Sequence, residues 1–111
     1  AKLKQLGEIE VAQMELFGEL LRDLQEVDEA DGSLLDNTMV LYGCHMGDAN
    51  IHNNKNLPII LAGGKFRHGQ HLAFNQQNNR PLANLYLSML HNMGLEIDRF
   101  ASSTGTLTGL V

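Results

Sequence analysis

The chain has 111 residues, a formal net charge of −5, 43% apolar residues and 19% charged residues. A chain of this size buries roughly two thirds of its unfolded surface, enough for one core, and its composition excludes collagen, disorder and coiled-coil arrays. It has no apolar run long enough to span a membrane and no basic stripe for phosphates, so we expect a single globular domain, residues 1–111, without membrane or nucleic-acid partners.

Neither the cysteine content nor the first residues of the sequence indicate the cellular compartment of the protein. Cys44 is the only cysteine, so no internal disulfide can form, and no Cys-x-x-Cys pair indicates a closed zinc site. The sequence opens on a charged, helix-like stretch without an apolar signal region. An export signal is therefore either absent or upstream, and we expect the chain to be a fragment of a larger protein.

Apolar residues recur three and four positions apart from Ala1 to about Ala30, which predicts one long amphipathic helix. The main stripe consists of Leu6, Ile9, Ala12, Leu16, Leu20, Leu24 and Val27. Gly7 and Gly18 each weaken such a helix by about 1 kcal/mol relative to alanine. A small sheet cannot cover so broad a stripe, so we expect a homo-oligomer that associates through this helix or a sheet edge.

Two short apolar runs predict strands, Met39 to Tyr42 and Pro58 to Ala62, the second closed by a glycine pair. Neither run alternates with polar residues, so we expect both strands to be covered on both faces. A polar loop, Cys44 to Asn56, connects them.

The remaining sequence predicts one more regular element. Residues Lys65 to Arg80 are mostly polar and predict a long loop. A second helix is expected from Pro81 to Met93, because proline is tolerated in a first helical turn and Gly94 ends the apolar pattern. The tail from Ser102 to Val111 has few apolar anchors, so we expect it to be loosely held.

The loop after the first strand carries the residues best suited to chemistry. His45, Asp48, Asn50 and His52 lie within eight residues, where the carboxyl end of a strand in an open sheet places ligand sites. Imidazole and carboxylate groups are ligands for a divalent metal such as zinc. Two further imidazoles could join from the next loop, those of His68 and His71.

Simpler interpretations compete at each of these positions. Surface histidines and an Asx turn would explain the loop without any ligand. Cys44 beside His45 could form an activated thiolate, but a buried, inert cysteine is the simpler expectation. His91 follows Ser88 on the second helix, yet no acid completes a triad there.

Three stretches, Leu35 to Tyr42, Leu57 to Gly64 and Leu82 to Gly94, together resemble the sulfatase and alkaline-phosphatase-like superfamily. The whole segment from Tyr42 to Gly64 and the closing stretch Arg99 to Leu110 most closely resemble an uncharacterised bacterial domain-of-unknown-function family of that kind. The resemblance implies a parallel pairing of the two strands and, in hydrolase members, a Ser-Asp-His-Gly segment whose Asp and His bind a catalytic metal.

At the place of that segment this chain has Cys44, His45, Met46 and Gly47. Methionine is a poor ligand for hard or borderline metals, so one ligand of the superfamily pattern is lost. The resemblance implies that the nucleophile and the other ligands lie upstream. The metal ligands we would expect here are therefore His52 and Asp48, with His45 third.

The sequence thus predicts an α/β fold, a layered sheet with a long N-terminal helix and a partial alkaline-phosphatase-like core. The expected function is that of a C-terminal fragment of a protein of this superfamily, with an incomplete metal-binding loop and no catalysis on its own. The alternative is a non-catalytic binding or self-assembly module. Any enzymatic activity of the parent protein, its substrate and its localisation stay open.

Overall fold

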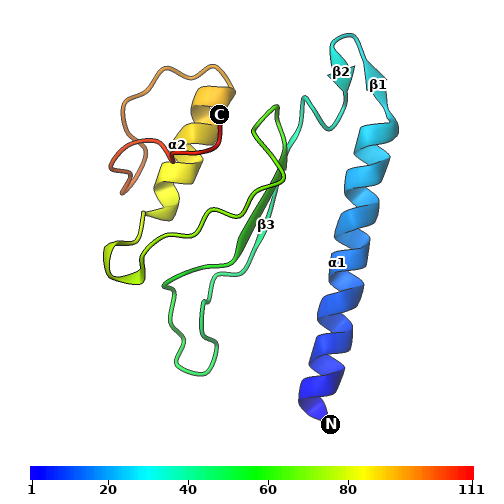
Figure 1. Ribbon diagram of the computed structural model, residues 1–111, viewed down its shortest axis with the longest axis vertical. Coiled ribbons are helices and arrows are strands. Elements are labelled where there is room, and N and C mark those ends of the chain that lie inside the picture. The colour runs from blue at the N-terminus through cyan, green and yellow to red at the C-terminus, as the bar shows by residue number, and fades with distance from the viewer. The chain divides into compact units, whose positions relative to one another are not determined.

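The computed structural model describes residues 1–111, which divide into two compact units, residues 1–38 and 39–111 (Figure 1). Mixed α/β structure and a long N-terminal helix are present, as expected, with two small antiparallel sheets. In chain order the elements are α1 (Lys2–Glu26), β1 (Asp28–Glu29), β2 (Gly32–Ser33), β3 (Met39–Gly43), β4 (Ile59–Gly63), the 3-10 helix η1 (Gln76–Asn78) and α2 (Leu82–Asn92). Neither α-helix combines the length and apolar character needed to cross a bilayer.

The first unit consists of α1 and the β1–β2 hairpin. The helix stops at Glu26, so the expected end near Ala30 is wrong: Val27 is extended, and the acidic residues that follow pair in an antiparallel hairpin. Negative charges are unfavourable at the negative end of a helix dipole. Asp36 closes the turn that follows the hairpin: its Oδ2 accepts hydrogen bonds from the Ser33 amide and hydroxyl at 2.8 and 2.9 Å.

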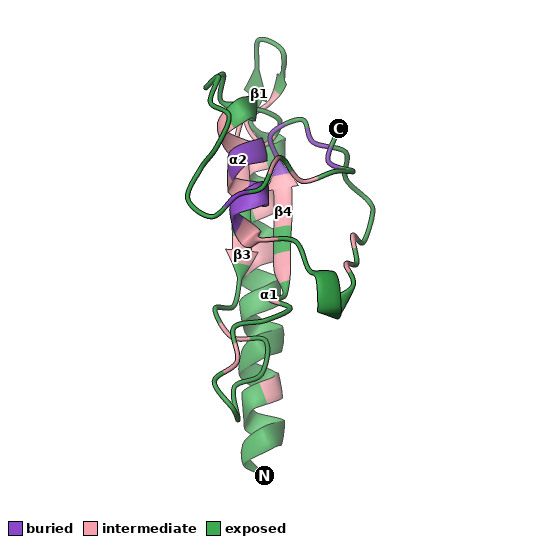
Figure 2. Ribbon diagram, turned by 90° about the vertical axis from the view of Figure 1, so that its left-hand side faces the viewer, coloured by how far each residue is buried: buried purple, intermediate pink, exposed green.

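The chain after this hairpin returns to the end of α1 and bonds to the carbonyl groups of Leu24, in the last helical turn, and of the C-cap residue Val27. The amide of Leu34 donates to the carbonyl of Val27 at 2.8 Å, and that of Leu35 donates to the carbonyl of Leu24 at 3.0 Å. These bonds replace partners that the last helical turn lacks. Even so, no residue of α1 is buried, and Figure 2 shows almost its whole length as exposed.

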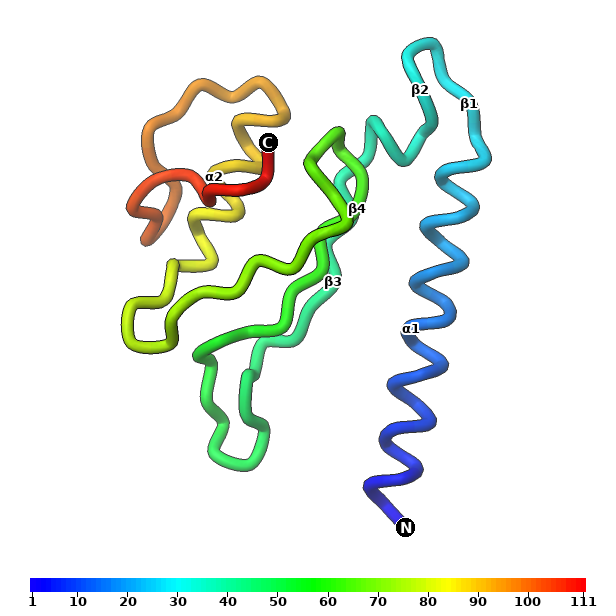
Figure 3. Tube along the Cα trace, in the orientation of Figure 1, coloured from blue at the N-terminus to red at the C-terminus, as the bar shows by residue number.

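The second unit begins with the antiparallel ladder of β3 and β4, in a register from Met39 opposite Gly63 to Gly43 opposite Ile59. The expected parallel pairing is therefore wrong. A parallel connection needs a crossover, usually a helix, whereas this loop turns back on itself and re-enters the sheet beside β3 (Figure 3). The expectation that both strands are covered on both faces also fails, because Gly63 is the only buried residue in them.

A small core joins the ladder to α2. Phe66, Leu85 and Leu110 form its buried centre. Side chains from one face of the ladder and from the flanking segments pack against them: Met39, Ile59, Leu61, Leu72, Leu82, Met89 and Leu107. The helix α2 itself lies within one residue of its expected bounds, with Pro81 as its N-cap residue. The long loop before it contains the short helix η1.

Two buried polar residues on α2 hold the C-terminal tail. The amide side chain of Asn84 accepts from the Thr104 N–H at 2.9 Å and donates to the Thr104 hydroxyl at 3.2 Å. The Ser88 hydroxyl accepts from the Leu107 N–H at 2.8 Å and donates to the Asn84 carbonyl at 3.0 Å. The tail, which Figure 1 shows beside α2, is thus fixed by polar contacts, and the expectation of a loosely held tail is wrong.

The glycine pair Gly63 and Gly64, at the end of β4, is buried because other groups approach its backbone closely. The carbonyl of Gly63 bonds to Nε2 of His68 at 2.9 Å, and that of Gly64 accepts from Nδ2 of Asn92 at 2.9 Å. Gly64 has φ +66, and a Cβ on it would collide with Cγ of Met39. Position 64 therefore requires glycine, because its φ is positive and because there is no room for a Cβ.

Replacing Gly64 with alanine should destabilise the second unit by about 2 to 4 kcal/mol, from the left-handed backbone and the collision together. Gly69→Ala is the matched control, since Gly69 also has a positive φ, +74, but a Cβ there meets nothing within 4 Å. That control should cost about 1 kcal/mol. Urea denaturation followed by circular dichroism measures both, and equal midpoints would show that Met39 does not pack on Gly64.

Candidate functional site

The loop between β3 and β4 is held by its own backbone. Asp48 and Asn53 form an isolated antiparallel bridge, in which the Asn53 N–H donates to the Asp48 carbonyl at 2.9 Å. The carbonyl of Asn53 accepts from the amides of Gly47 and Asp48 at 2.8 and 3.2 Å. A side chain on Gly47 would collide with the Lys55 carbonyl, so this close approach depends on glycine.

Two side chains close turns within the same loop. Oδ1 of Asp48 accepts from the Asn50 N–H at 2.9 Å, and Oδ1 of Asn53 accepts from the Lys55 N–H at 2.9 Å. Both are Asx turns, in which a short polar side chain bonds the backbone two residues further on. The Asx turn expected as the simpler interpretation of Asp48 is therefore present. His52, between these turns, has the left-handed φ of 51°.

The proposed ligands are all exposed, and the structure does not gather them into a cluster. His45, Asp48 and His52 lie on the surface of the loop. No group of three or more His, Cys, Asp or Glu side chains in the chain is placed to hold a metal ion. His68 bonds to the Gly63 carbonyl, and His71 is exposed in the next loop. Any metal affinity of this loop would therefore rest on fewer than three such side chains.

The residues weighed as nucleophiles have other roles. Cys44 is exposed, so the expectation that it is buried is wrong, and its Sγ accepts a hydrogen bond from the Met46 N–H at 3.5 Å. Ser88 is fully used by the tail contact described above. His91 bonds through Nε2 to the carbonyl of Ile97 at 2.6 Å, which fixes the turn after α2.

Asn84 was not expected from the sequence to be important, and Ser88 was considered only as a nucleophile beside His91, yet both are among the most buried polar residues of the chain. The sequence does contain an indication that these two residues act together. They lie four positions apart, and therefore on one face, in a helix whose buried positions are otherwise apolar. A polar pair of this kind needs hydrogen-bond partners when it is buried. Their partners come from the tail, and their role is structural.

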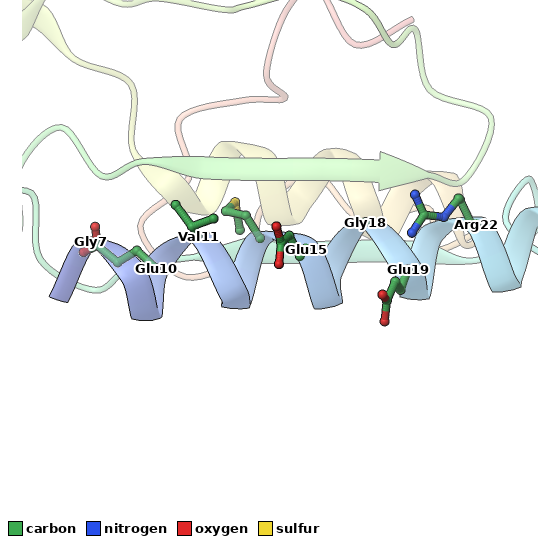
Figure 4. Close-up of a pocket in the computed structure, with 8 residues that line it drawn as sticks. Gly7, Glu10, Val11, Glu15, Gly18, Glu19 and Arg22 are labelled. Atoms are coloured by element: carbon green, nitrogen blue, oxygen red, sulfur yellow. The ribbon is translucent and has the colours of Figure 1, made fainter. Parts of the chain in front are cut away.

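One face of α1 is hollowed where its two glycines lie. Figure 4 shows Val11 between Gly7 and Gly18 on this face, with carboxylates and a guanidinium along the sides. The lining residues are Gly7, Glu10, Val11, Met14, Glu15, Gly18, Glu19 and Arg22. A Cβ on either glycine would meet nothing within 4 Å. The hollow follows from the missing side chains of one helix and is a shallow surface groove.

Comparisons with known proteins leave the family open. No protein-family model matches the chain, and searches of curated proteins and of solved structures found no match. The function of the chain must therefore be inferred from its own geometry.

The Asx turn gives a test of what Asp48 does. Asp48→Asn keeps an Oδ1 acceptor for the Asn50 N–H, whereas Asp48→Ala removes it. We expect Asp48→Ala to speed hydrogen exchange of the Asn50 amide by about fivefold or more, corresponding to about 1 kcal/mol, and Asp48→Asn to leave it nearly unchanged. NMR-detected exchange measures both rates. Equal acceleration in the two variants would mean that the carboxylate charge, and not the turn, determines the loop structure.

Proposed function

We propose that this chain is a non-catalytic binding and self-assembly module, and that α1 is the element through which it associates. The observation that carries the proposal is the exposed apolar surface of α1, a helix of 25 residues without one buried residue. We call the row of large apolar side chains along α1 and at Val27, the residue that follows the helix, the α1 stripe. Its members and their exposed fractions are Leu6 50%, Ile9 56%, Leu16 66%, Leu20 46% and Val27 48%.

The spacing of the α1 stripe is that of a helix-pairing seam. Positions 6, 9, 13, 16, 20, 23 and 27 alternate three and four residues apart, the pattern that keeps one row facing a second helix. Apolar residues occupy five of these seven positions; Gln13 and Asp23 are the exceptions. A contiguous row of exposed apolar side chains of this kind marks an interaction surface.

The stability of α1 also favours a partner. Most helical stability in proteins comes from packing an apolar face and not from intrinsic propensity. Two interior glycines weaken α1 further, by about 1 kcal/mol each relative to alanine. Within its own unit, Leu24 in the last turn of the helix and Val27 after it accept backbone hydrogen bonds from Leu35 and Leu34, and a short hairpin follows. Contact along the α1 stripe would supply the missing stabilisation.

Self-association should therefore depend on the α1 stripe. We expect sedimentation of the wild type to give species larger than 12.3 kDa at high protein concentration. Leu16→Gln should weaken this association by about tenfold or more, because it removes a large apolar contact. Val11→Gln is the matched control, since Val11 is similarly exposed, 59%, but lies on the groove face and outside the stripe. A wild type that sediments as a monomer throughout would remove the proposal.

A second candidate function is that of the C-terminal part of an alkaline-phosphatase-like protein with an incomplete metal-binding loop. What supports it is the sequence resemblance, together with three exposed potential ligands, His45, Asp48 and His52, on one turn-closed loop. The antiparallel β3–β4 ladder departs from the parallel pairing that the resemblance implies. This candidate therefore ranks second.

Calorimetry with zinc, manganese and calcium tests the loop. Under the second candidate the wild type binds zinc weakly, His52→Ala loses most of that affinity, and His71→Ala, a histidine outside the loop, keeps it. Equal zinc affinity in all three proteins would remove the site assignment. Assays with aryl phosphate and aryl sulfate esters should show no turnover. Turnover that survives purification and is lost in His52→Ala would contradict the absence of catalysis.

A further inference from the structure

We infer that the partner of α1 is α1 of a second copy of the same chain, and that the two helices pair antiparallel. This inference rests on the self-assembly proposed above and adds the identity of the partner and the direction of pairing. The distribution of charge along the first unit, residues 1–38, supports both the partner and the direction.

The two ends of α1 carry opposite charge. Its first turns contain Lys2 and Lys4 and no acidic residue before Glu8. Around its other end, from Glu19 to Asp31, one cation stands among six carboxylates. These are Arg22 against Glu19, Asp23, Glu26, Asp28, Glu29 and Asp31.

This negative charge is also held in place. The side-chain amide of Asn37 donates to Oε2 of Glu29 at 2.5 Å and to Oδ1 of Asp31 at 3.0 Å. Two carboxylates of the hairpin are therefore kept close together beside the end of α1. A fixed cluster of this kind costs free energy unless cations lie near it.

Both ends of α1 oppose its own dipole. The positive N-terminus of a helix favours acidic residues and the negative C-terminus favours basic ones, but the first turn of α1 has no acid and its last turn has no base. An antiparallel second helix reverses this. It places Lys2 and Lys4 of each copy beside the carboxylates of the other. The two helix dipoles then lie antiparallel, with the positive end of each beside the negative end of the other.

A parallel pair would have the opposite effect. It would bring the lysines of the two copies together at one end and twelve carboxylates together at the other, since each copy has six from Glu19 to Asp31. Like charges placed side by side are destabilising. The charge pattern therefore selects the antiparallel direction for a second copy.

The α1 stripe fits this direction at full overlap of the two helices. When Lys2 of one copy lies level with Val27 of the second copy, Ile9 lies level with Leu20 of the second copy. These two large apolar residues, both about half exposed in the single chain, then cover one another twice in the symmetric pair. The register also pairs Gln13 with Leu16 of the second copy, near the middle of the overlap.

Cysteine cross-linking tests the direction. In the full chain with Cys44→Ser, Ile9→Cys and Leu20→Cys are made as two separate proteins, and circular dichroism checks that each keeps its helix. Mixed and oxidised, they should form a disulfide-linked heterodimer, while each variant alone stays mostly uncross-linked. In the antiparallel pair the two copies of position 9 lie about 16 Å apart along the axis, too far for a disulfide.

The outcomes separate this inference from the proposed function. Efficient cross-linking of Ile9→Cys with itself, in a chain that still dimerises, would mean parallel pairing and would overturn the inference while leaving self-assembly intact. A chain that stays monomeric, or whose α1 packs on residues 39–111 of its own copy, would overturn both. If the chain forms an oligomer but no cross-link forms through positions 9 and 20, the interface lies elsewhere. That result would overturn the inference and leave self-assembly intact.

A charge variant gives an independent readout. The double variant Lys2→Glu and Lys4→Glu improves the match of α1 to its own dipole, so the isolated helix should be no less stable. It should nevertheless weaken dimerisation by tenfold or more at low salt, with a smaller difference at 1 M salt because exposed charges are screened. Dimerisation that is unchanged or stronger in this variant at low salt would contradict the antiparallel pairing.

Discussion

The hydrogen bonds that the C-terminal tail donates to Asn84 and Ser88 on α2 are the interaction on which the second unit depends. They fix the tail at Thr104 and Leu107, and this brings Leu110 onto Phe66 at the centre of the core. A two-stranded ladder is marginal by itself and needs a covering element. The helix and the tail together provide that cover on one face of β3 and β4.

The two units are stabilised in different ways. Residues 39–111 build a small core in which every buried polar side-chain atom has a hydrogen-bond partner. Residues 1–38 have a long helix with an exposed apolar stripe and charges that oppose its own dipole. These features are unfavourable in an isolated helix and favourable in an antiparallel pair, which is why we connect the function of the chain with assembly.

The β3–β4 loop shows how a set of residues typical of a metal site can have another physical role. Asp48 and Asn53 use their side chains to close turns, and Gly47 permits the close approach of the Lys55 carbonyl. Loop sequence alone did not specify where His45 and His52 would lie, because side-chain direction in a loop depends on each local turn. In the folded chain these histidines are exposed, and no cluster of three ligands forms.

The sequence by itself determined the elements whose signal is local and periodic. Apolar spacing located α1 and α2, and unbroken apolar runs located β3 and β4, each to within a few residues. The tertiary structure decided the rest: the antiparallel pairing of β3 with β4, the early end of α1 in a hairpin, and the anchoring of the tail by Asn84 and Ser88. These features depend on partners distant in sequence or on single hydrogen bonds. Hydrophobic periodicity shows which face of a helix or strand is apolar. It does not show which other part of the chain packs against that face.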